Sequence, residues 1–168
     1  MKQAKLAEML RKHDDWLNDR DGGERADLQN ADLQNADLRN SNLQNANLQN
    51  ADLRFADLRF ADLYNADLLN ADLLNSNLQN SNLRFAVLYN ACGNSLHLKS
   101  IQNDKYNICY TSEVMQIGCE QHTIKAWFKF DDKTISDMDT GALEWWKVWK
   151  PILKKIIKVS PAKPTKEE

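Results

Sequence analysis

Thirteen copies of one five-residue motif follow one another without a gap from residue 26 to residue 90. Each copy reads Ala or Ser, then Asp or Asn, then Leu, then two further residues, and only Val87 departs from this pattern. Successive leucines would rotate by about 140° around a helix and would alternate between the faces of a straight strand. All the leucines point inward only if the chain turns by roughly 90° at each copy, so that four copies close a coil of about twenty residues.

Stacked coils would pair each backbone with its neighbour at a spacing of about 4.8 Å. Leu28, Leu48, Leu68 and Leu88 would then form one column of a leucine core. The Ala and Ser positions are small because they face the same narrow interior. Asn and Asp suit the corners, since both tolerate turn dihedrals and can bond to their own backbone.

The motif resembles the pentapeptide repeat family, from Ala26-Asp27-Leu28-Gln29-Asn30 through Ala86-Val87-Leu88-Tyr89-Asn90. Known members are right-handed quadrilateral β-helices, so the resemblance implies that handedness here. The expected fold is therefore mainly β, a β-helix of about three coils with an N-terminal helical cap and a small C-terminal α+β module. The resemblance covers about two fifths of the 168 residues.

The flanking segments differ in composition from the repeats and suggest four units. They are an N-terminal helical cap (1–25), the repeat β-helix (26–92), an α+β module (93–159) and a disordered tail (160–168). Leu6, Met9, Leu10, His13, Trp16 and Leu17 recur at helical spacing, which predicts a helix over 2–18. A solenoid exposes an open core and an unpaired edge at its first coil, so this helix is expected to cover that end.

Beyond Cys92 the chain predicts short strands and helices. Strands are expected at 97–102, 106–111 and 114–119, with a turn at Ser112-Glu113, and helical turns at 123–130 and 134–138. Ile117-Gly118-Cys119, Trp127, Ile135, Met138 and 142–146 resemble a tail found on some bacterial and phage pentapeptide repeat proteins. That resemblance implies no activity.

Residues 143–159 predict an amphipathic helix. One half of its wheel is apolar and the other half carries lysines, with Pro151 on the polar side, where it is expected to kink the helix. The apolar half consists of Trp145, Trp146, Val148, Trp149, Ile152, Leu153, Ile156 and Ile157.

The charged N-terminus lacks the apolar stretch of a signal peptide, and no apolar run approaches the length of a membrane span. The formal net charge is -2. The three cysteines have no framework spacing, as is usual for reduced thiols. We therefore expect a cytoplasmic location.

Few residues suggest chemistry. Cys119-x-x-His122 with Cys109, and with His97 or Cys92 as a fourth ligand, would make a zinc site, but the spacing matches no closed zinc pattern. No third group orients a Cys-His nucleophilic pair, and no glycine-rich phosphate loop is present. The sequence predicts no catalytic residue, no metal site and no cofactor, and hence a protein that is not an enzyme.

Some pentapeptide repeat proteins protect DNA gyrase by resembling DNA, which makes a DNA-mimicking topoisomerase inhibitor or protector one alternative. Three and a quarter coils are roughly 15 Å tall, a length over which B-DNA carries about nine negative charges. The repeats hold eight Asp against four Arg, and several acidic positions are Asn or Val. The simpler explanation is that Asp is a good corner residue, and no nucleic acid is expected as a partner.

The outward residues change from Gln and Asn in the early coils to apolar side chains in the later ones. Such an apolar surface marks an interface, either with the chain's own C-terminal module, with a second copy in a homodimer, or with another protein. We predict a non-enzymatic scaffold for an unknown protein partner. Its candidate surface is Phe55, Phe60, Tyr64, Leu69, Leu74, Phe85, Val87 and Tyr89.

Two further interpretations remain open. The Arg-Phe pairs at 54–55, 59–60 and 84–85 are compatible with cation–π packing without a functional role. The helix bearing Trp145, Trp146, Trp149, Ile152, Leu153 and Ile156 would suit peripheral membrane association, although capping the coil is a simpler use for it.

Overall fold

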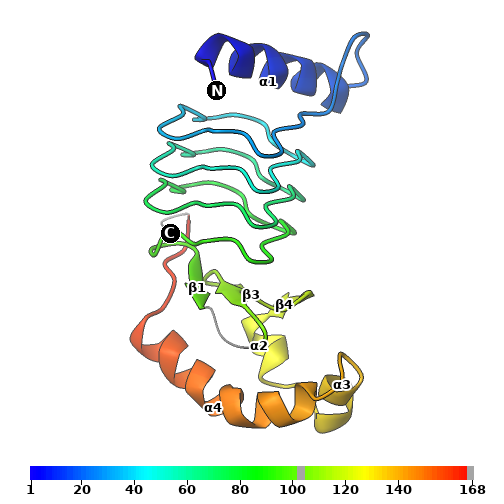
Figure 1. Ribbon diagram of the computed structural model, residues 1–168, viewed down its shortest axis with the longest axis vertical. Helices are drawn as coiled ribbons and strands as arrows, with labels where there is room; N and C mark the ends of the chain where they lie inside the picture. The colour runs from blue at the N-terminus through cyan, green and yellow to red at the C-terminus, as the bar shows by residue number, and fades with distance from the viewer. Residues whose placement is uncertain (102–104, 166–168) are drawn as a thin grey trace.

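Figure 1 shows the computed structural model, which describes residues 1–101 and 105–165. The repeats form a stack of coils, with α1 (Gln3–Leu17) across one end and a small sheet with α4 (Ala142–Val159) at the other. Isolated parallel bridges join residues twenty positions apart, from Asp27 with Asn47 to Asp72 with Cys92. Successive bridges begin five residues apart, so each coil has four sides, as the leucine spacing predicts.

Two side chains of each repeat make the turn, and they do so in different ways. The fifth residue always has a positive φ, between 54° and 60°, a conformation that Asn adopts more readily than most residues. In every repeat except the last, which has Val87 there, the second residue accepts a hydrogen bond from the backbone N–H two positions later, as Asp27 Oδ1 does from Gln29 at 3.2 Å. The corner role predicted for Asn and Asp is thus confirmed and divided between two positions.

The leucines and the small residues fill the coil as predicted. The leucines at the third position of the repeats are at most 7% exposed, and Leu6 of α1 joins their cluster from the N-terminal end. Helix α1 lies over the first coil (Figure 1). His13 Nδ1 accepts a hydrogen bond from Ala26 N–H at 3.0 Å, which ties the helix to the first repeat.

Gly23 ends the connection from α1 to the coil at a point where no side chain fits. A Cβ there would lie 2.4 Å from the backbone nitrogen of Trp16. The glycine therefore allows the chain to cross close beneath the helix before it enters the first repeat.

A four-stranded antiparallel sheet follows the last coil. It consists of β1 (Lys99–Ile101), β2 (Ile108–Tyr110), β3 (Val114–Ile117) and β4 (Glu120–Thr123), in sequence order. The predicted turn at Ser112-Glu113 joins β2 to β3, whose residues Tyr110 and Met115 pair. One sheet face meets the open end of the coil, and the other meets the helices.

The helices and the far face of the sheet enclose a second core. Short helices α2 (Ile124–Trp127) and α3 (Asp132–Ser136) precede α4, and their buried residues pack with Tyr110, Trp146 and Leu153. Helix α4 runs through Pro151 as one element. Its apolar half was predicted too broadly, because Val148 and Ile152 are 60% and 40% exposed while Trp146 and Leu153 are buried.

The sequence prediction differs from the structure in three places. The strands are shorter than predicted, and β4 was not anticipated. Gln102, the last residue of the first predicted strand, lies outside the described residues, so the prediction there is not tested. The predicted disordered tail is wrong for 160–165: Tyr110 OH donates to Ser160 O, and Lys163 N–H to Leu96 O. These bonds hold the segment against the sheet and the end of the coil, whereas 166–168 lie outside the described residues.

Candidate functional site

The twenty-residue register divides the coil surface into four faces. Face 1 holds the repeats that begin at 26, 46, 66 and 86; face 2 those at 31, 51 and 71; face 3 those at 36, 56 and 76; and face 4 those at 41, 61 and 81. Residues one coil apart lie one above the other on the same face. The register therefore decides which exposed side chains can act together.

Charge is distributed unevenly over these faces. Face 1 carries two aspartates and no arginine, and face 2 carries three aspartates and one arginine. On face 3 two aspartates match two arginines, and on face 4 Asp62 matches Arg84. Two adjacent faces are therefore acidic by two charges each, and the other two are neutral.

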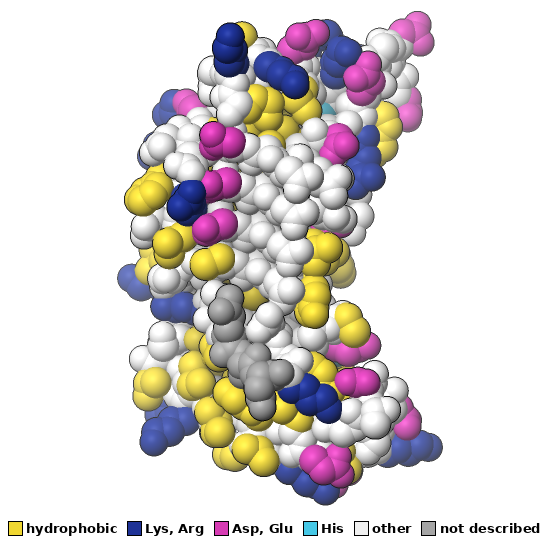
Figure 2. Space-filling model, viewed as in Figure 1, with side chains coloured by type: hydrophobic (Ala, Val, Ile, Leu, Met, Phe, Trp, Pro, Cys, Tyr) yellow, Lys and Arg dark blue, Asp and Glu magenta, His cyan; other side chains and the backbone are white. Residues whose placement is uncertain are grey.

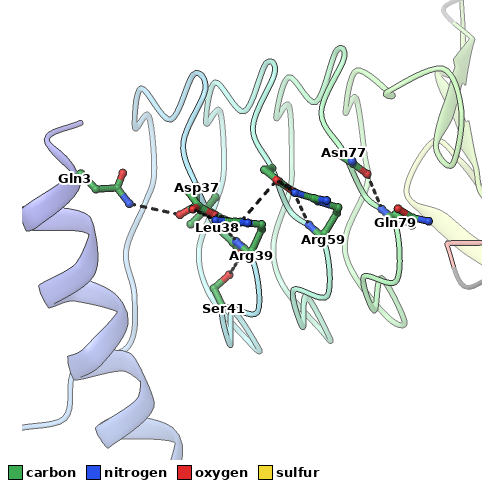
Figure 3. Close-up of polar contacts among 9 residues, drawn as sticks. Gln3, Asp37, Leu38, Arg39, Ser41, Arg59, Asn77 and Gln79 are labelled. Carbon is green, nitrogen blue, oxygen red and sulfur yellow. Dashed lines mark hydrogen bonds and ion pairs between the residues drawn. The ribbon is translucent and has the colours of Figure 1, made fainter.

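Ion pairs run along face 3 (Figure 3). Arg39 Nη2 lies 2.6 Å from Asp37 Oδ2, Arg59 Nη2 lies 2.6 Å from Asp57 Oδ2, and Arg39 Nε lies 3.8 Å from Asp57 of the next coil. The hydrogen bonds from Arg39 lower the pKa of Asp37 to about 2, and those from Arg59 lower the pKa of Asp57. These carboxylates stay ionised, but the adjacent guanidinium groups neutralise the face.

The apolar residues predicted as one surface lie on different faces. Leu69, Val87 and Tyr89 lie on face 1 and Leu74 on face 2. The other four begin at the end of face 2 and run around faces 3 and 4: Phe55 ends a face 2 repeat, Phe60 ends a face 3 repeat, and Tyr64 and Phe85 lie in face 4 repeats. We call these four residues the aromatic edge. Figure 2 accordingly shows hydrophobic side chains on both flanks of the coil rather than in one patch.

The C-terminal module does not cover the aromatic edge, because it packs on the open end of the coil and not on its faces. Phe55, Phe60 and Phe85 are 55%, 58% and 59% exposed. Tyr64 and Phe85 contact each other edge to face, with ring centroids 5.3 Å apart. Of the three Arg-Phe pairs, only Arg84 lies over its phenylalanine, at 5.7 Å, since Arg54 and Arg59 pair with aspartates.

The open end of the coil meets one row of registered residues on the sheet. Ser100, Cys109, Gln116 and Gln121 are cross-strand partners on neighbouring strands. Cys109 Sγ–H donates to Ala91 O at 3.1 Å and Gln121 Nε2–H to Ala86 O at 3.2 Å. Gln116 Oε1 accepts from Leu88 N–H at 2.9 Å, and Ser100 Oγ accepts from Gly93 N–H at 3.2 Å. These bonds replace the partners that a further coil would supply.

The remaining sides of the last coil are bonded by one residue that precedes the sheet in the sequence and by one that follows α4. Asn94 Nδ2–H donates to Ser76 O at 3.2 Å, and Thr165 Oγ1–H donates to Ser81 O at 2.8 Å. Thr165 O also accepts from Asn80 N–H. The sequence prediction did not assign these capping residues. The signal in the sequence is Gln116, a polar residue between Met115 and Ile117 in the predicted strand, and the structure shows that it is buried.

The cysteines and histidines considered for a zinc site or for nucleophilic chemistry do not form one cluster, and each contacts different residues. Cys109 is buried, and burial raises the pKa of its thiol to about 12. His122 lies 3.2 Å from Glu120, and His97 Nδ1 faces the carbonyls of Lys163 and Pro164. Within 1–101 and 105–165, no three Cys, His, Asp or Glu side chains are grouped closely enough to hold a metal ion.

The predicted helix residues mostly face the second core. Trp146 and Leu153 are buried and Trp145, Trp149 and Ile156 are half-buried, while Ile152 faces outward. None of the described helices is both long and apolar enough to cross a bilayer.

The family model for pentapeptide repeats matches residues 24–59 and 56–92, with eight copies. No curated protein matches the chain. Three solved structures that are similar to it are all pentapeptide repeat proteins. One from the cyanobacterium Cyanothece 51142 is 34% identical over 42% of this chain and 48% of its own, with a TM-score of 0.40.

The second solved structure, from the Arabidopsis thaliana thylakoid lumen, is 34% identical over 39% of this chain and 49% of its own, with a TM-score of 0.26. The third, from Nostoc PCC 7120, is 34% identical over 52% of this chain and 72% of its own, with a TM-score of 0.21. The chain spans about half the length of the first two. Because these TM-scores are low, the relationship rests on the repeat sequence, and through residues 24–92 the chain belongs to the pentapeptide repeat family.

Proposed function

We propose that this chain is a non-enzymatic scaffold in which a right-handed quadrilateral β-helix presents the aromatic edge to a protein partner. Each coil is bonded to the next along four sides, so the edge is held on a rigid support. A rigid surface loses little conformational entropy on binding. The partner is either a foreign protein or a second copy of the chain.

The observation that carries this proposal is the choice of phenylalanine at three corners. Ten of the thirteen repeats place Asn at the fifth position, where φ is near 60°. Phe55, Phe60 and Phe85 adopt the same φ, which costs a residue other than Gly, Asn or Asp about 1 kcal/mol or more. All three are more than half exposed, so burial within the chain does not offset this cost. Neither the turn conformation nor packing in the core explains the phenylalanines, whereas binding to a partner would explain them.

The chemistry around the aromatic edge suits a protein interface. Aromatic residues and arginine are enriched in the energetically important centres of interfaces, and each of the three phenylalanines follows an arginine. Faces 3 and 4, which carry Phe60, Tyr64 and Phe85, have no net charge, so a partner need not bring compensating charge there. These features favour a protein partner over duplex mimicry, for which the ion pairs along face 3 leave too little net charge.

Membrane association through α4 has less support than the scaffold role. The tryptophans that would anchor the helix in a bilayer pack into the second core, and Trp146 is 3% exposed. The exposed apolar residues of α4 are the smaller Val148, Ile152 and Val159. Vesicles of anionic lipid that retained the full chain in a flotation assay would favour this alternative.

The proposal predicts that substitutions in the aromatic edge abolish partner binding without lowering the stability of the fold. Replacing Phe55, Phe60 and Phe85 together by Asn should raise the melting temperature, because Asn is the residue the other corners use. The same variant should lose the partner. A lower melting temperature would show that the phenylalanines are structural and would contradict the proposal.

Partner contact can be tested by placing a photo-crosslinking amino acid at position 60. Position 70 is the matched control, since Asn70 has the same corner conformation on face 1. One adduct is expected from position 60 in a cell lysate, with loss of that adduct when Phe55 and Phe85 are Asn. Equal adducts from both positions would count against the aromatic edge, and light scattering of the purified chain shows whether the adduct is a second copy.

A further inference from the structure

A cavity of about 300 Å³ lies where the last coil meets the C-terminal module. Its walls come from Tyr89 of the coil, Tyr106, and three tryptophans, with Cys119 also in the lining. The tryptophans are Trp127 of α2 and Trp145 and Trp146 of α4. This volume is at the lower end of the range for pockets that hold small molecules. It admits a single substituted ring and excludes a dinucleotide or a folded peptide.

The aromatic walls are held in place by the protein's own contacts. Gly118 has φ +57°, and a Cβ there would lie 3.2 Å from the Tyr106 ring, so glycine lets this ring lie against the turn between β3 and β4. Tyr106 OH donates to Asp139 Oδ2 at 2.5 Å, and its ring meets Trp145 edge to face at 5.0 Å. Trp127 Nε1–H donates to Met115 O. The cavity is therefore formed before any ligand enters.

Three formally charged side chains line the cavity, namely Lys105, Glu120 and Asp139. Hydrogen bonds from Tyr106 and from Thr140 N–H lower the pKa of Asp139, which keeps its carboxylate ionised. Lys105 donates to Thr140 O at 2.8 Å. The N-terminus of α4 adds a partial positive charge of about one half, so the two carboxylates still outweigh the positive groups.

Aromatic faces attract cations, and the rings of this module already do so. Lys105 Nζ lies 5.0 Å from the centroid of Tyr106, and Lys150 Nζ lies 5.6 Å from that of Trp146. A negative rim and ring-lined walls together select a positively charged ligand with an apolar body. We propose that this cavity binds a small organic cation, an amine or quaternary ammonium group carried on one ring.

Three probes of similar size and different charge test the proposal on the full chain. Benzylamine is the cation, benzyl alcohol the neutral form and benzoate the anion, and binding is measured by calorimetry at about pH 8, where an unperturbed histidine is neutral. Benzylamine is expected to bind about tenfold more tightly than either other probe, a difference of about 1.4 kcal/mol that lies within the range of partly desolvated cation–π contacts. Equal or tighter binding of benzyl alcohol or benzoate, or no binding of benzylamine, would overturn the proposal.

Matched variants locate the site. Asp139→Asn keeps a hydrogen-bond acceptor for Tyr106 and removes the charge, so it should weaken benzylamine binding several-fold, whereas Asp137→Asn, outside the cavity, should not. Glu120→Gln removes the other carboxylate of the cavity lining, so it tests the role of negative charge should Asp139→Asn fold poorly. Equal losses in Asp137→Asn and the rim variants would mean a general charge effect and would refute the site.

The alkylation rate of Cys119, which lines the cavity, provides an independent measure of ligand binding. Its thiol is exposed, whereas Cys109 is buried. Saturating benzylamine should slow alkylation of Cys119 by iodoacetamide and leave the alkylation of Cys92 unchanged, as read by peptide mass. An unchanged rate at Cys119 would contradict binding in this cavity.

Discussion

The N-terminal end of the coil is closed by a helix that directly precedes it, and the C-terminal end by a sheet with a segment that returns from the far end of the chain. At the N-terminal end Leu6 enters the leucine core, and only a few hydrogen bonds accompany it. At the C-terminal end a row of polar side chains bonds the last coil, and Thr165 bonds Ser81 across 84 positions. One end is closed chiefly by apolar packing and the other by hydrogen bonds.

The difference follows from what each end lacks. Both ends expose the leucine core and carbonyls that a further coil would have bonded. At the N-terminal end the carbonyls of Asp32 and Asp37 accept from Met1 and Gln3 in exposed bonds. At the C-terminal end the carbonyls of Ser76, Ser81, Ala86 and Ala91 are bonded in buried or partly buried positions. A buried carbonyl without a partner costs about 1–3 kcal/mol. Four such groups on four sides need donors at fixed positions. The row of strands supplies two of these donors, to Ala86 O and Ala91 O, and the segments that flank the sheet module supply the other two, to Ser76 O and Ser81 O.

The largest effect is expected at the packed end. Leu6→Ala should lower the free energy of unfolding by about 2–5 kcal/mol, because Leu6 is 1% exposed and its removal leaves a cavity in the core. Urea unfolding followed by circular dichroism measures it. Leu10→Ala is the control, since Leu10 is only partly buried, and a loss as large at Leu10 would show that α1 is not anchored by Leu6 in particular.

At the hydrogen-bonded end, Gln116→Leu removes the acceptor for Leu88 N–H and should cost about 1–3 kcal/mol. The exposed Gln29→Leu in the first coil changes the same side chain and should stay within about 0.5 kcal/mol. Equal stability of the two variants in urea would show that the row is not required for closure. Such a result would make both ends depend on packing.

The sequence predicts the coil well because its constraint is local. Each repeat carries its own turn residues and its own leucine, so the four-sided coil, the column of leucines and the helix over the first coil all follow from spacing. The register of residues twenty apart also allows the faces to be assigned. Once that register is known, the face on which each apolar residue lies can be assigned from its residue number alone.

The capping row is not visible in the sequence because its members are brought together only by strand register. Ser100, Cys109, Gln116 and Gln121 have no constant spacing, and β4 at 120–123 has too little apolar alternation to be recognised as a strand. The segment 160–165 has the proline and charge content of a disordered tail, and only its bonds to the coil end order it. Tertiary partners therefore determine what composition alone leaves open.

The N-terminal end also has one polar contact whose strength depends on pH. Burial lowers the pKa of His13, so the folded chain binds fewer protons than the unfolded chain in the window between that lowered pKa and about 6.5. Stability from this contact is fully present above that window and is lost as the pH falls through it. A protonated ring would also turn Nδ1 into a donor facing the donor Ala26 N–H.

Urea midpoints measured from about pH 7.5 down to about pH 5.5 should therefore fall more steeply for the native sequence than for His13→Asn, which has no ring to protonate. Identical slopes would show that protonation of His13 does not destabilise the N-terminal end. The carboxylates of the ion pairs titrate well below this range, as the lowered pKa of Asp37 shows, so they do not mask the difference.

The smallest effect expected is at Cys109, where the hydrogen bond can be separated from packing. Because burial raises the thiol pKa to about 12, Cys109 stays protonated and remains a donor to Ala91 O at any physiological pH. Cys109→Ser keeps a donor and should change stability by less than about 1 kcal/mol, whereas Cys109→Ala removes it and should cost about 1 kcal/mol more. If both variants lose the same stability in urea, the thiol acts at this end only by filling space. The end closed by hydrogen bonds would then contain a packed contact of the kind that Leu6 makes at the other end.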